Sequence, residues 1–253
     1  MRKNLLIFGF VGLGLISLLF FTVPQNSTDN KQKGVLTLTF DDGLKSQYEI
    51  AFKEMQKQSY EGTLFIVANW TGLFEGRELM SFDNAKEIQE NSWEIGSHSL
   101  SHNFQNRLTR ISDEELKNEL DKSKEILEKE GFKIQTFAPP FGDYNNKVKE
   151  ETKNYYLYVR PLEWGYNSFE NIDSYNLKSK WVMTKYSSDD VCSWIKKANS
   201  ENLWLILNFH HIGEEKTPWD FSKQKFKEVL ECINNEGIEI KTIREVLENE
   251  KRN

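Results

Sequence analysis

The chain has 253 residues, 38% of them hydrophobic, and a formal net charge of −6. That length favours one large domain over two small ones and is enough to bury a hydrophobic core without stabilising disulfides or metals. The negative charge, with no cluster of lysine and arginine to offset it, excludes the phosphate backbone of a nucleic acid as a partner.

The N-terminal segment differs from the rest of the chain. Residues 5–23 carry no charge and come after Arg2 and Lys3. A run of about this length, ~20 residues, crosses a bilayer as a helix, and basic residues ahead of it predict export of the chain on its C-terminal side. Residues 22–25 form a poor cleavage site, so an uncleaved membrane anchor is favoured, with a removed signal peptide as the alternative.

We therefore expect residues 1–33 to be this anchor or signal segment with a short polar tether. Residues 34–253 are expected to form one domain outside the cytoplasm, either membrane-anchored through residues 5–23 or secreted.

Strand-like and helix-like segments alternate through the rest of the chain. Apolar runs predict strands at 35–40, 63–68, 93–96, 136–138, 155–159, 180–183, 203–209 and 238–240. Apolar faces predict helices at 48–55, 81–91, 112–131, 187–198, 226–237 and from 242 onward, with a long loop at 69–80. This alternation predicts an α/β fold: a distorted (β/α) barrel of about seven parallel strands, preceded by the N-terminal hydrophobic helix.

Two cysteines, Cys192 and Cys232, lie beside the apolar faces of two predicted helices. In an exported chain they could form a disulfide, and two free, half-buried thiols are the alternative. Both are distant in sequence from the histidines, so neither is expected to bind a metal.

The residues that could carry chemistry lie where predicted strands end. Asp41 and Asp42 come after the first strand, His98 and His102 after the third, and His210 after the strand at 203–209. In β/α folds the active site is built at the carboxyl ends of the strands. One carboxylate and a His-x₃-His pair can hold one divalent metal, which leaves the second carboxylate for acid–base chemistry.

Each of these pieces also has a structural interpretation. An aspartate ahead of a helix often caps it, and histidines four apart can be ordinary surface residues. His210 could be a buried histidine bonded to a backbone carbonyl, and His211 competes with it because strand alternation turns only one of the two inward.

Together the motifs resemble those of the polysaccharide deacetylases, the NodB-homology domain of carbohydrate esterase family four. Residues 39–43 match the first motif, 98–102 the second, 137–142 the third and 207–210 the fifth, in the same order, and the resemblance covers about residues 34–248. It implies a hydrolase that removes acetyl groups from a polysaccharide.

The resemblance also implies a role for each matching residue. Asp42, His98 and His102 would bind one divalent metal, usually Zn²⁺, with Co²⁺, Ni²⁺ or Mn²⁺ as other candidates. Asp41 would be the general base and His210 the general acid. The backbone N–H of Phe141 would help to hold the oxyanion.

The sequence departs from the family at two places. Ala138 stands where the third motif often has an arginine that pairs with the catalytic aspartate. Burial of an unpaired carboxylate would raise its pKa, so we hypothesise that Arg160, after the next strand, supplies this charge; the alternative is a surface arginine. The fourth motif has no clear match, although Glu163, Trp164 and Trp181 lie in its region.

Several aromatic residues could stack on sugars, although core packing is their commoner use. They are Trp70, Phe74, Trp164, Tyr166 and Trp219. Among the candidates for substrate binding we name Pro140 and Trp164.

The sequence thus predicts a metal-dependent deacetylase acting on N-acetylated amino sugars of an extracellular or cell-wall polysaccharide. Two alternatives stay open: an O-acetyl glycan esterase on the same fold, and a glycan-binding module with impaired catalysis.

Overall fold

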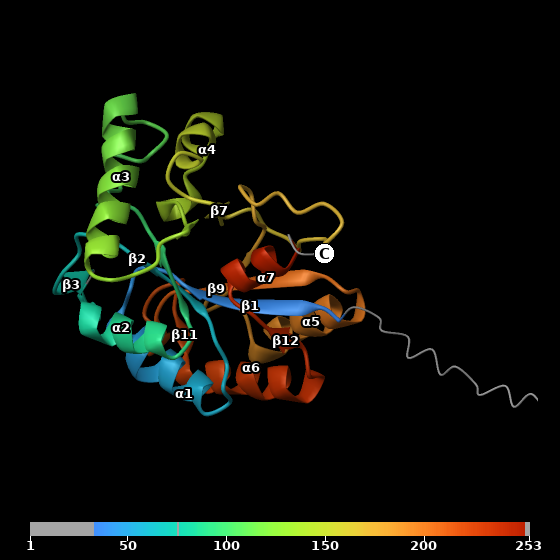
Figure 1. Cartoon of the computed structure of the whole chain (residues 1–253). Coiled ribbons are helices and arrows are strands. Elements are labelled where there is room, and N and C mark those ends of the chain that lie inside the picture. The colour runs from blue at the N-terminus through green and yellow to red at the C-terminus, as the bar shows by residue number, and fades with distance from the viewer. Residues whose placement is uncertain (1–32, 75, 251–253) are drawn as a thin grey trace, which may run out of the picture. The chain divides into compact units, whose positions relative to one another are not determined.

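The computed structural model describes residues 33–74 and 76–250 (Figure 1). Its strands are β1 (Val35–Phe40), β2 (Thr63–Ile66), β3 (Leu73–Phe74), β4 (Arg77–Glu78), β5 (Glu94–Ser97), β6 (Thr136–Phe137), β7 (Tyr158–Val159), β8 (Lys180–Trp181), β9 (Trp204–Phe209), β10 (Ile212–Gly213), β11 (Phe221–Ser222) and β12 (Glu239–Ile240). Its helical segments are the π-helical η1 (Gln47–Phe52), α1 (Lys53–Gln56), α2 (Phe82–Glu90), α3 (Asp113–Lys129), the 3₁₀ turn η2 (Pro140–Gly142), α4 (Asn146–Thr152), α5 (Ser188–Ser200), α6 (Lys223–Glu236) and α7 (Ile243–Glu250).

The main sheet has β1 in its middle and parallel pairing between neighbours. The strands take the order β7-β6-β5-β2-β1-β9-β8, and β12 pairs with β1 as well. All six residues of β1 are buried, and its two threonines are satisfied inside the core. The Thr37 hydroxyl donates to the carbonyl of Lys241 at 2.7 Å, and the Thr39 hydroxyl to that of Leu207 at 3.1 Å. The predicted α/β class with a parallel sheet is confirmed.

The sheet is curled rather than closed. Within the described residues β7 and β8 do not pair, and the irregular segment 160–179 lies between them. The N–H of Leu177 donates to the carbonyl of Val159 at 3.1 Å, and that of Ser179 to Glu163 at 2.8 Å. This segment contains Pro161, three Asn, three Ser and one Asp, which favour turns over a crossover helix. The predicted barrel is therefore a half-barrel whose remaining gap is covered by irregular chain.

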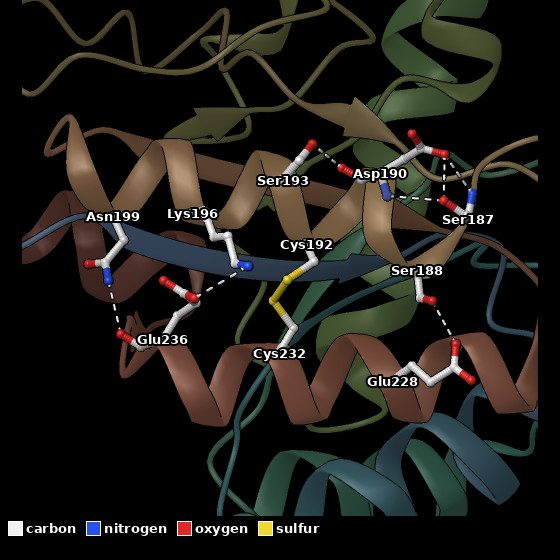
Figure 2. Close-up of a disulfide and its surroundings, with 10 residues drawn as sticks. All are labelled: Ser187, Ser188, Asp190, Cys192, Ser193, Lys196, Asn199, Glu228, Cys232 and Glu236. Atoms are coloured by element: carbon white, nitrogen blue, oxygen red, sulfur yellow. Dashed lines mark hydrogen bonds and ion pairs between the residues drawn. A yellow bond between two sulfur atoms is a disulfide. The ribbon is translucent and has the colours of Figure 1, made fainter.

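Helices α5 and α6 are joined by a disulfide and by hydrogen bonds. In Figure 1 they lie side by side beneath β1, and α5 packs on both β1 and β9. A disulfide joins Cys192 of α5 to Cys232 of α6 (Figure 2), so the alternative of two free thiols is wrong. On either side of it, the Ser188 hydroxyl donates to the Glu228 carboxylate at 2.6 Å, and the Asn199 amide donates to a backbone carbonyl of α6 at 2.9 Å.

Helix α3 begins as its sequence predicts. The Ser112 hydroxyl accepts the N–H of Glu115 at 3.2 Å, and the Glu115 carboxylate accepts the N–H of Ser112 at 2.8 Å, which completes a capping box. The predicted apolar face of Leu116, Leu120 and Leu127 is buried.

Three features go beyond the sequence prediction. The loop at 69–80 contains a short hairpin of β3 and β4, the periodicity gives no indication of α4, and β10 pairs with β11 beyond His211. The predicted N-terminal hydrophobic helix lies outside the described residues. Within residues 33–74 and 76–250, no helix combines the length and hydropathy that a membrane span requires.

Candidate active site

Five residues of the site each take the first position after a strand. They are Asp41 after β1, His98 after β5, Ala138 after β6, Arg160 after β7 and His210 after β9. Since these strands are parallel, their carboxyl ends meet at one edge of the sheet. Phe40 pairs with Phe209 in the register of β1 and β9, so Asp41 and His210 emerge side by side.

Asp42, His98 and His102 converge to form a cluster that could hold a metal ion. Each residue offers one ligand atom, and these atoms lie within 4.8 Å of one another. Nε2 of His98 is 3.6 Å from Oδ1 of Asp42, and Nε2 of His102 is 3.5 Å from the same oxygen. One carboxylate and two imidazoles form a donor set that Zn²⁺ and its first-row neighbours accept.

The orientation of His98 is fixed by the next strand. Its Nδ1–H donates to the backbone carbonyl of Ala138 at 2.7 Å, which leaves the lone pair of Nε2 directed at the cluster. Burial lowers the pKa of His98, and burial together with His98 lowers that of His102 to about 2. Both imidazoles are therefore neutral near pH 7, the form that binds a metal.

Strained backbone is concentrated around the cluster. Asp42, Ser99, His102 and Phe141 have φ values of 80°, 67°, 49° and 60°, in the left-handed region that non-glycine residues rarely adopt. The Ser99 hydroxyl accepts the N–H of His102 at 3.1 Å and so closes a turn. This turn, not a helix, brings the second histidine of the His-x₃-His pair back toward the first.

Asp41 is buried and held on both oxygens. Arg160 donates a hydrogen bond to Oδ1, and Nδ2 of Asn208 donates to Oδ2 at 3.1 Å. Burial alone raises the pKa of Asp41, but Arg160, His98 and His210 reverse this effect and bring it to about 2. Arg160 is only 1% exposed, so the alternative of a surface arginine is wrong. The structure places its guanidinium where the charge missing at Ala138 would act.

His210 lies beside Asp41 and has one ring nitrogen without a hydrogen-bond partner in the described part of the chain. Its Nε2 is 4.0 Å from Oδ2 of Asp41, whereas its Nδ1 is buried and has no hydrogen-bond partner among the described residues. Burial lowers the pKa of His210 to about 4. His211 turns away, with Nδ1 3.0 Å from the hydroxyl of Ser46.

Gln47 is a site residue that the sequence does not reveal. Its side-chain amide donates to the backbone carbonyls of Asp41 and His210, the latter at 3.0 Å, and its carbonyl oxygen accepts the N–H of Leu44 at 3.1 Å. One buried side chain thus ties the end of β1 to the end of β9. Asn208 could have been suspected, because it precedes His210 in the matched fifth motif.

The cluster opens into a cavity of about 410 Å³. Its lining includes the predicted site residues Asp41, Asp42, His98, His102, Phe141 and His210. Phe74 and Trp219, two of the aromatic candidates for sugar stacking, line it as well, and the Trp219 ring lies 5.2 Å from that of His210. Two arginines that the sequence analysis does not single out, Arg77 and Arg107, complete the charged part of the wall.

The two residues named for substrate binding lie outside this lining. Pro140 is the buried first residue of the turn η2, and the cavity is lined by Pro139 instead. Trp164 packs against Trp181 and Trp194, with ring centres 4.7 and 5.3 Å apart. Trp164 remains 39% exposed, so a role in substrate binding stays a prediction.

The fold and the site define the class: an α/β half-barrel with a potential metal centre and a charge-paired aspartate at the carboxyl edge of its strands. The chain belongs to the polysaccharide deacetylase family, described as "Polysaccharide deacetylase", which it matches over residues 28–159. The matched segment holds Asp41, Asp42, His98 and His102 and ends just before Arg160.

Curated relatives agree with this family. The chain is 24% identical to the peptidoglycan-N-acetylmuramic acid deacetylase PdaC of Bacillus subtilis, over 52% of this chain and 27% of that protein. It is 27% identical to a peptidoglycan-N-acetylglucosamine deacetylase of Bacillus cereus, over 55% of this chain and 46% of that protein. The chain thus spans less than half the length of both.

The fold is similar to that of the Xyl-CE4 domain of a multidomain xylanase from the hindgut metagenome of Trinervitermes trinervoides. The TM-score is 0.59 at 17% identity, over 87% of this chain and 92% of that one.

Proposed function

We propose that the chain is a metal-dependent deacetylase that removes acetyl groups from N-acetylated amino sugars of an extracellular or cell-wall polysaccharide. The observation that carries this proposal is the convergence of Asp42, His98 and His102 beside a buried, charge-paired Asp41 at the base of a cavity. Membership of the polysaccharide deacetylase family supports it.

The metal site is proposed for one divalent ion, with Zn²⁺ as the first choice and Co²⁺, Ni²⁺ or Mn²⁺ as alternatives. Such an ion would make a water molecule acidic enough to react near neutral pH and would polarise the acetyl carbonyl. Asp42, His98 and His102 would hold it, with His98 kept in place by the carbonyl of Ala138.

The other residues would move protons and stabilise charge. Asp41, ionised because its pKa is about 2, would accept a proton from the attacking water, with Arg160 and Asn208 fixing its two oxygens. The backbone N–H of Phe141 would donate to the developing oxyanion.

His210 would protonate the leaving nitrogen. With its pKa lowered to about 4 it is neutral at pH 7, so it must receive that proton during the reaction. Asp41, 4.0 Å away, is the group placed to hand it over.

The names of relatives favour an amide substrate, because both curated relatives cited above are deacetylases of peptidoglycan amino sugars. An O-acetyl esterase on the same fold remains the second candidate, since a metal-activated water can attack an ester carbonyl as well as an amide carbonyl. A catalytically impaired glycan-binding module is the third, and the complete set of Asp41, Asp42, His98, His102 and His210 argues against it.

The disulfide supports a location outside the cytoplasm, whether the protein is anchored through residues 5–23 or secreted. Disulfides such as Cys192–Cys232 form and persist in oxidising compartments.

The deciding experiment is acetate release by the purified chain from a panel of N- and O-acetylated glycans, with added Zn²⁺ and with chelator. We expect release from the N-acetylated members with Zn²⁺ and loss of release with chelator. Unchanged release in chelator would reject metal dependence, and no release from any member would reject the enzyme in favour of the binding module.

A further inference from the structure

Arg107 is the charged residue of the cavity wall that lacks a counter-ion within the described residues. The other arginine, Arg77, is neutralised by a bidentate pair with Asp220, with both N–O distances at 2.6 Å. The ion pairs of the described residues include none with Arg107, and its buried Nε has no hydrogen-bond partner there.

Aromatic rings hold the Arg107 guanidinium in place. Its Cζ lies 4.6 Å from the ring centre of Phe104 and 4.9 Å from that of Phe141. The Phe141 ring lies 4.4 Å from that of His102. The positive charge is thus separated from a proposed metal ligand by the width of a single ring.

The backbone next to Arg107 is also anchored. Leu108 is buried in the core, and Thr109 donates from its N–H and its hydroxyl to the carboxylate of Asp143 at 2.8 Å. Asp143, two residues after Phe141, is thus engaged by Thr109, and no ion pair joins it to Arg107 among the described residues. The guanidinium is held in place, and no carboxylate of the described residues neutralises it.

A stacked guanidinium keeps the N–H groups at its edge available, and their planar fork matches a carboxylate. Partial desolvation of a cation costs free energy unless an anion compensates it. We propose that Arg107 recognises a carboxylate on the acetylated sugar, so that the preferred substrate is an acidic N-acetylated amino sugar, such as N-acetylmuramic acid with its lactyl carboxylate free. This specificity rests on the deacetylase function proposed above.

The rival explanation is that Arg107 only steadies the Phe141 turn. It would then support the reaction on every substrate equally. The two explanations therefore differ in how the effect of a substitution depends on the charge of the substrate.

The test compares peptide-free glycan strands that contain N-acetylmuramic acid with the same strands after their carboxylates have been amidated. The full chain, loaded with Zn²⁺, is assayed as wild type, Arg107→Gln and Arg107→Lys. Arg110→Gln is the matched control, because Arg110 is exposed and is not part of the cavity lining.

For Arg107→Gln we expect kcat/KM on the free-acid strands to fall about 10- to 100-fold, mainly through KM, the size expected for a lost charge-assisted hydrogen bond. On the amidated strands the change should stay within about 3-fold, as for a surface substitution. Arg107→Lys should restore part of the preference for the acid, and Arg110→Gln should leave it unchanged. An equal fall on both strands, or no fall on the free acid, would overturn the proposal.

A binding measurement separates this proposal from the function on which it rests. If none of the strands releases acetate, the proposed deacetylase function fails. Calorimetric binding of the same strands still decides the role of Arg107: tighter binding of the free acid that disappears in Arg107→Gln supports it, and equal binding of both strands rejects it.

Discussion

The carboxyl edge of the sheet and the α5–α6 layer differ in backbone strain and in how fully their polar groups are satisfied. The edge contains left-handed backbone at Asp42, Ser99, His102 and Phe141, and buried polar atoms without partners among the described residues on His102, Arg107 and His210. The α5–α6 layer has a capping box at Ser187, buried apolar faces and a disulfide between its helices (Figure 2).

The difference indicates that the α5–α6 layer contributes mainly to stability and the carboxyl edge mainly to reactivity. Strained backbone and unsatisfied polar atoms cost free energy and persist where the surrounding structure holds them. The sheet and its cross-linked helices supply that support, and the edge is left open to ligands. Substitutions in the two regions should therefore affect different measurements.

The largest effect is expected from Asp42→Ala. Loss of the carboxylate should remove the bound metal and lower acetate release on the order of 10³-fold or more, because the Lewis acid and the activated water are lost together. The melting temperature without metal should stay close to that of the wild type. Metal content, acetate release and melting are measured on the same preparation.

Asp83→Ala is the control for that substitution, since the Asp83 side chain is 93% exposed and lies outside the site. Full activity in Asp42→Ala would show that Asp42 is not a metal ligand.

The Cys192→Ser, Cys232→Ser double variant should show the reverse pattern. The disulfide closes a loop with a sequence separation of 40 residues. Its loss should lower the free energy of unfolding by about 3–4 kcal/mol in the chain-entropy description. Acetate release per folded molecule should not change. Chemical denaturation and activity are compared, with Ser188→Ala, which loses a hydrogen bond between the same helices, as the milder control. A large loss of activity in the folded double variant would contradict the separation of the two regions.

Arg160→Gln tests whether Arg160 supplies the positive charge beside Asp41 that Ala138, in the third motif, cannot provide. We expect kcat to fall about 10- to 100-fold, as is typical when a supporting residue of a metal site is lost. Metal content should stay near that of the wild type, because Arg160 contacts Asp41 and not the proposed ligands. An unaffected rate would remove Arg160 from the site, and a parallel loss of metal would indicate a structural role.

Asp220→Asn should have the smallest effect. Asp220 pairs with Arg77 of the cavity wall, so its contribution to stability marks the limit of the comparison. Burial raises the pKa of Asp220, but Arg77 and the N–H groups of Lys216 and Thr217 lower it to about 2, against an ordinary value of 3.8. A carboxylate with a depressed pKa stabilises the fold above its unfolded-state value, and this stabilisation is lost as the pH falls from about 4 to 2.

The difference in unfolding free energy between the wild type and Asp220→Asn should thus be up to about 2 kcal/mol at pH 6 and should shrink toward pH 2. Urea denaturation across this range measures it. A difference that does not change with pH would show that the charge of Asp220 is not the cause.

Much of the site is predictable because its residues come directly after strands. Apolar runs mark the strands, and polar residues that closely follow a run mark the edge, which points to Asp41, His98, Arg160 and His210. The disulfide cannot be decided in this way, because a pairing depends on the distance between two helices and not on their sequences. The substrate-binding candidates Pro140 and Trp164 lie outside the lining of the cavity, because the sequence does not show which neighbouring residue faces it.

The sequence by itself determined the alternation of elements, the α/β class, the motifs and the residues that could form a metal site, since each depends on local periodicity or on neighbours in the chain. Only the tertiary structure decided that Arg160 reaches Asp41, that Gln47 ties two strand ends together and that Arg107 faces the cavity without a counter-ion among the described residues. The physical reason is that these contacts join residues far apart in sequence. Packing and electrostatic interactions depend on distances of a few ångströms in space. The sequence of one segment does not show which distant side chain will come that close.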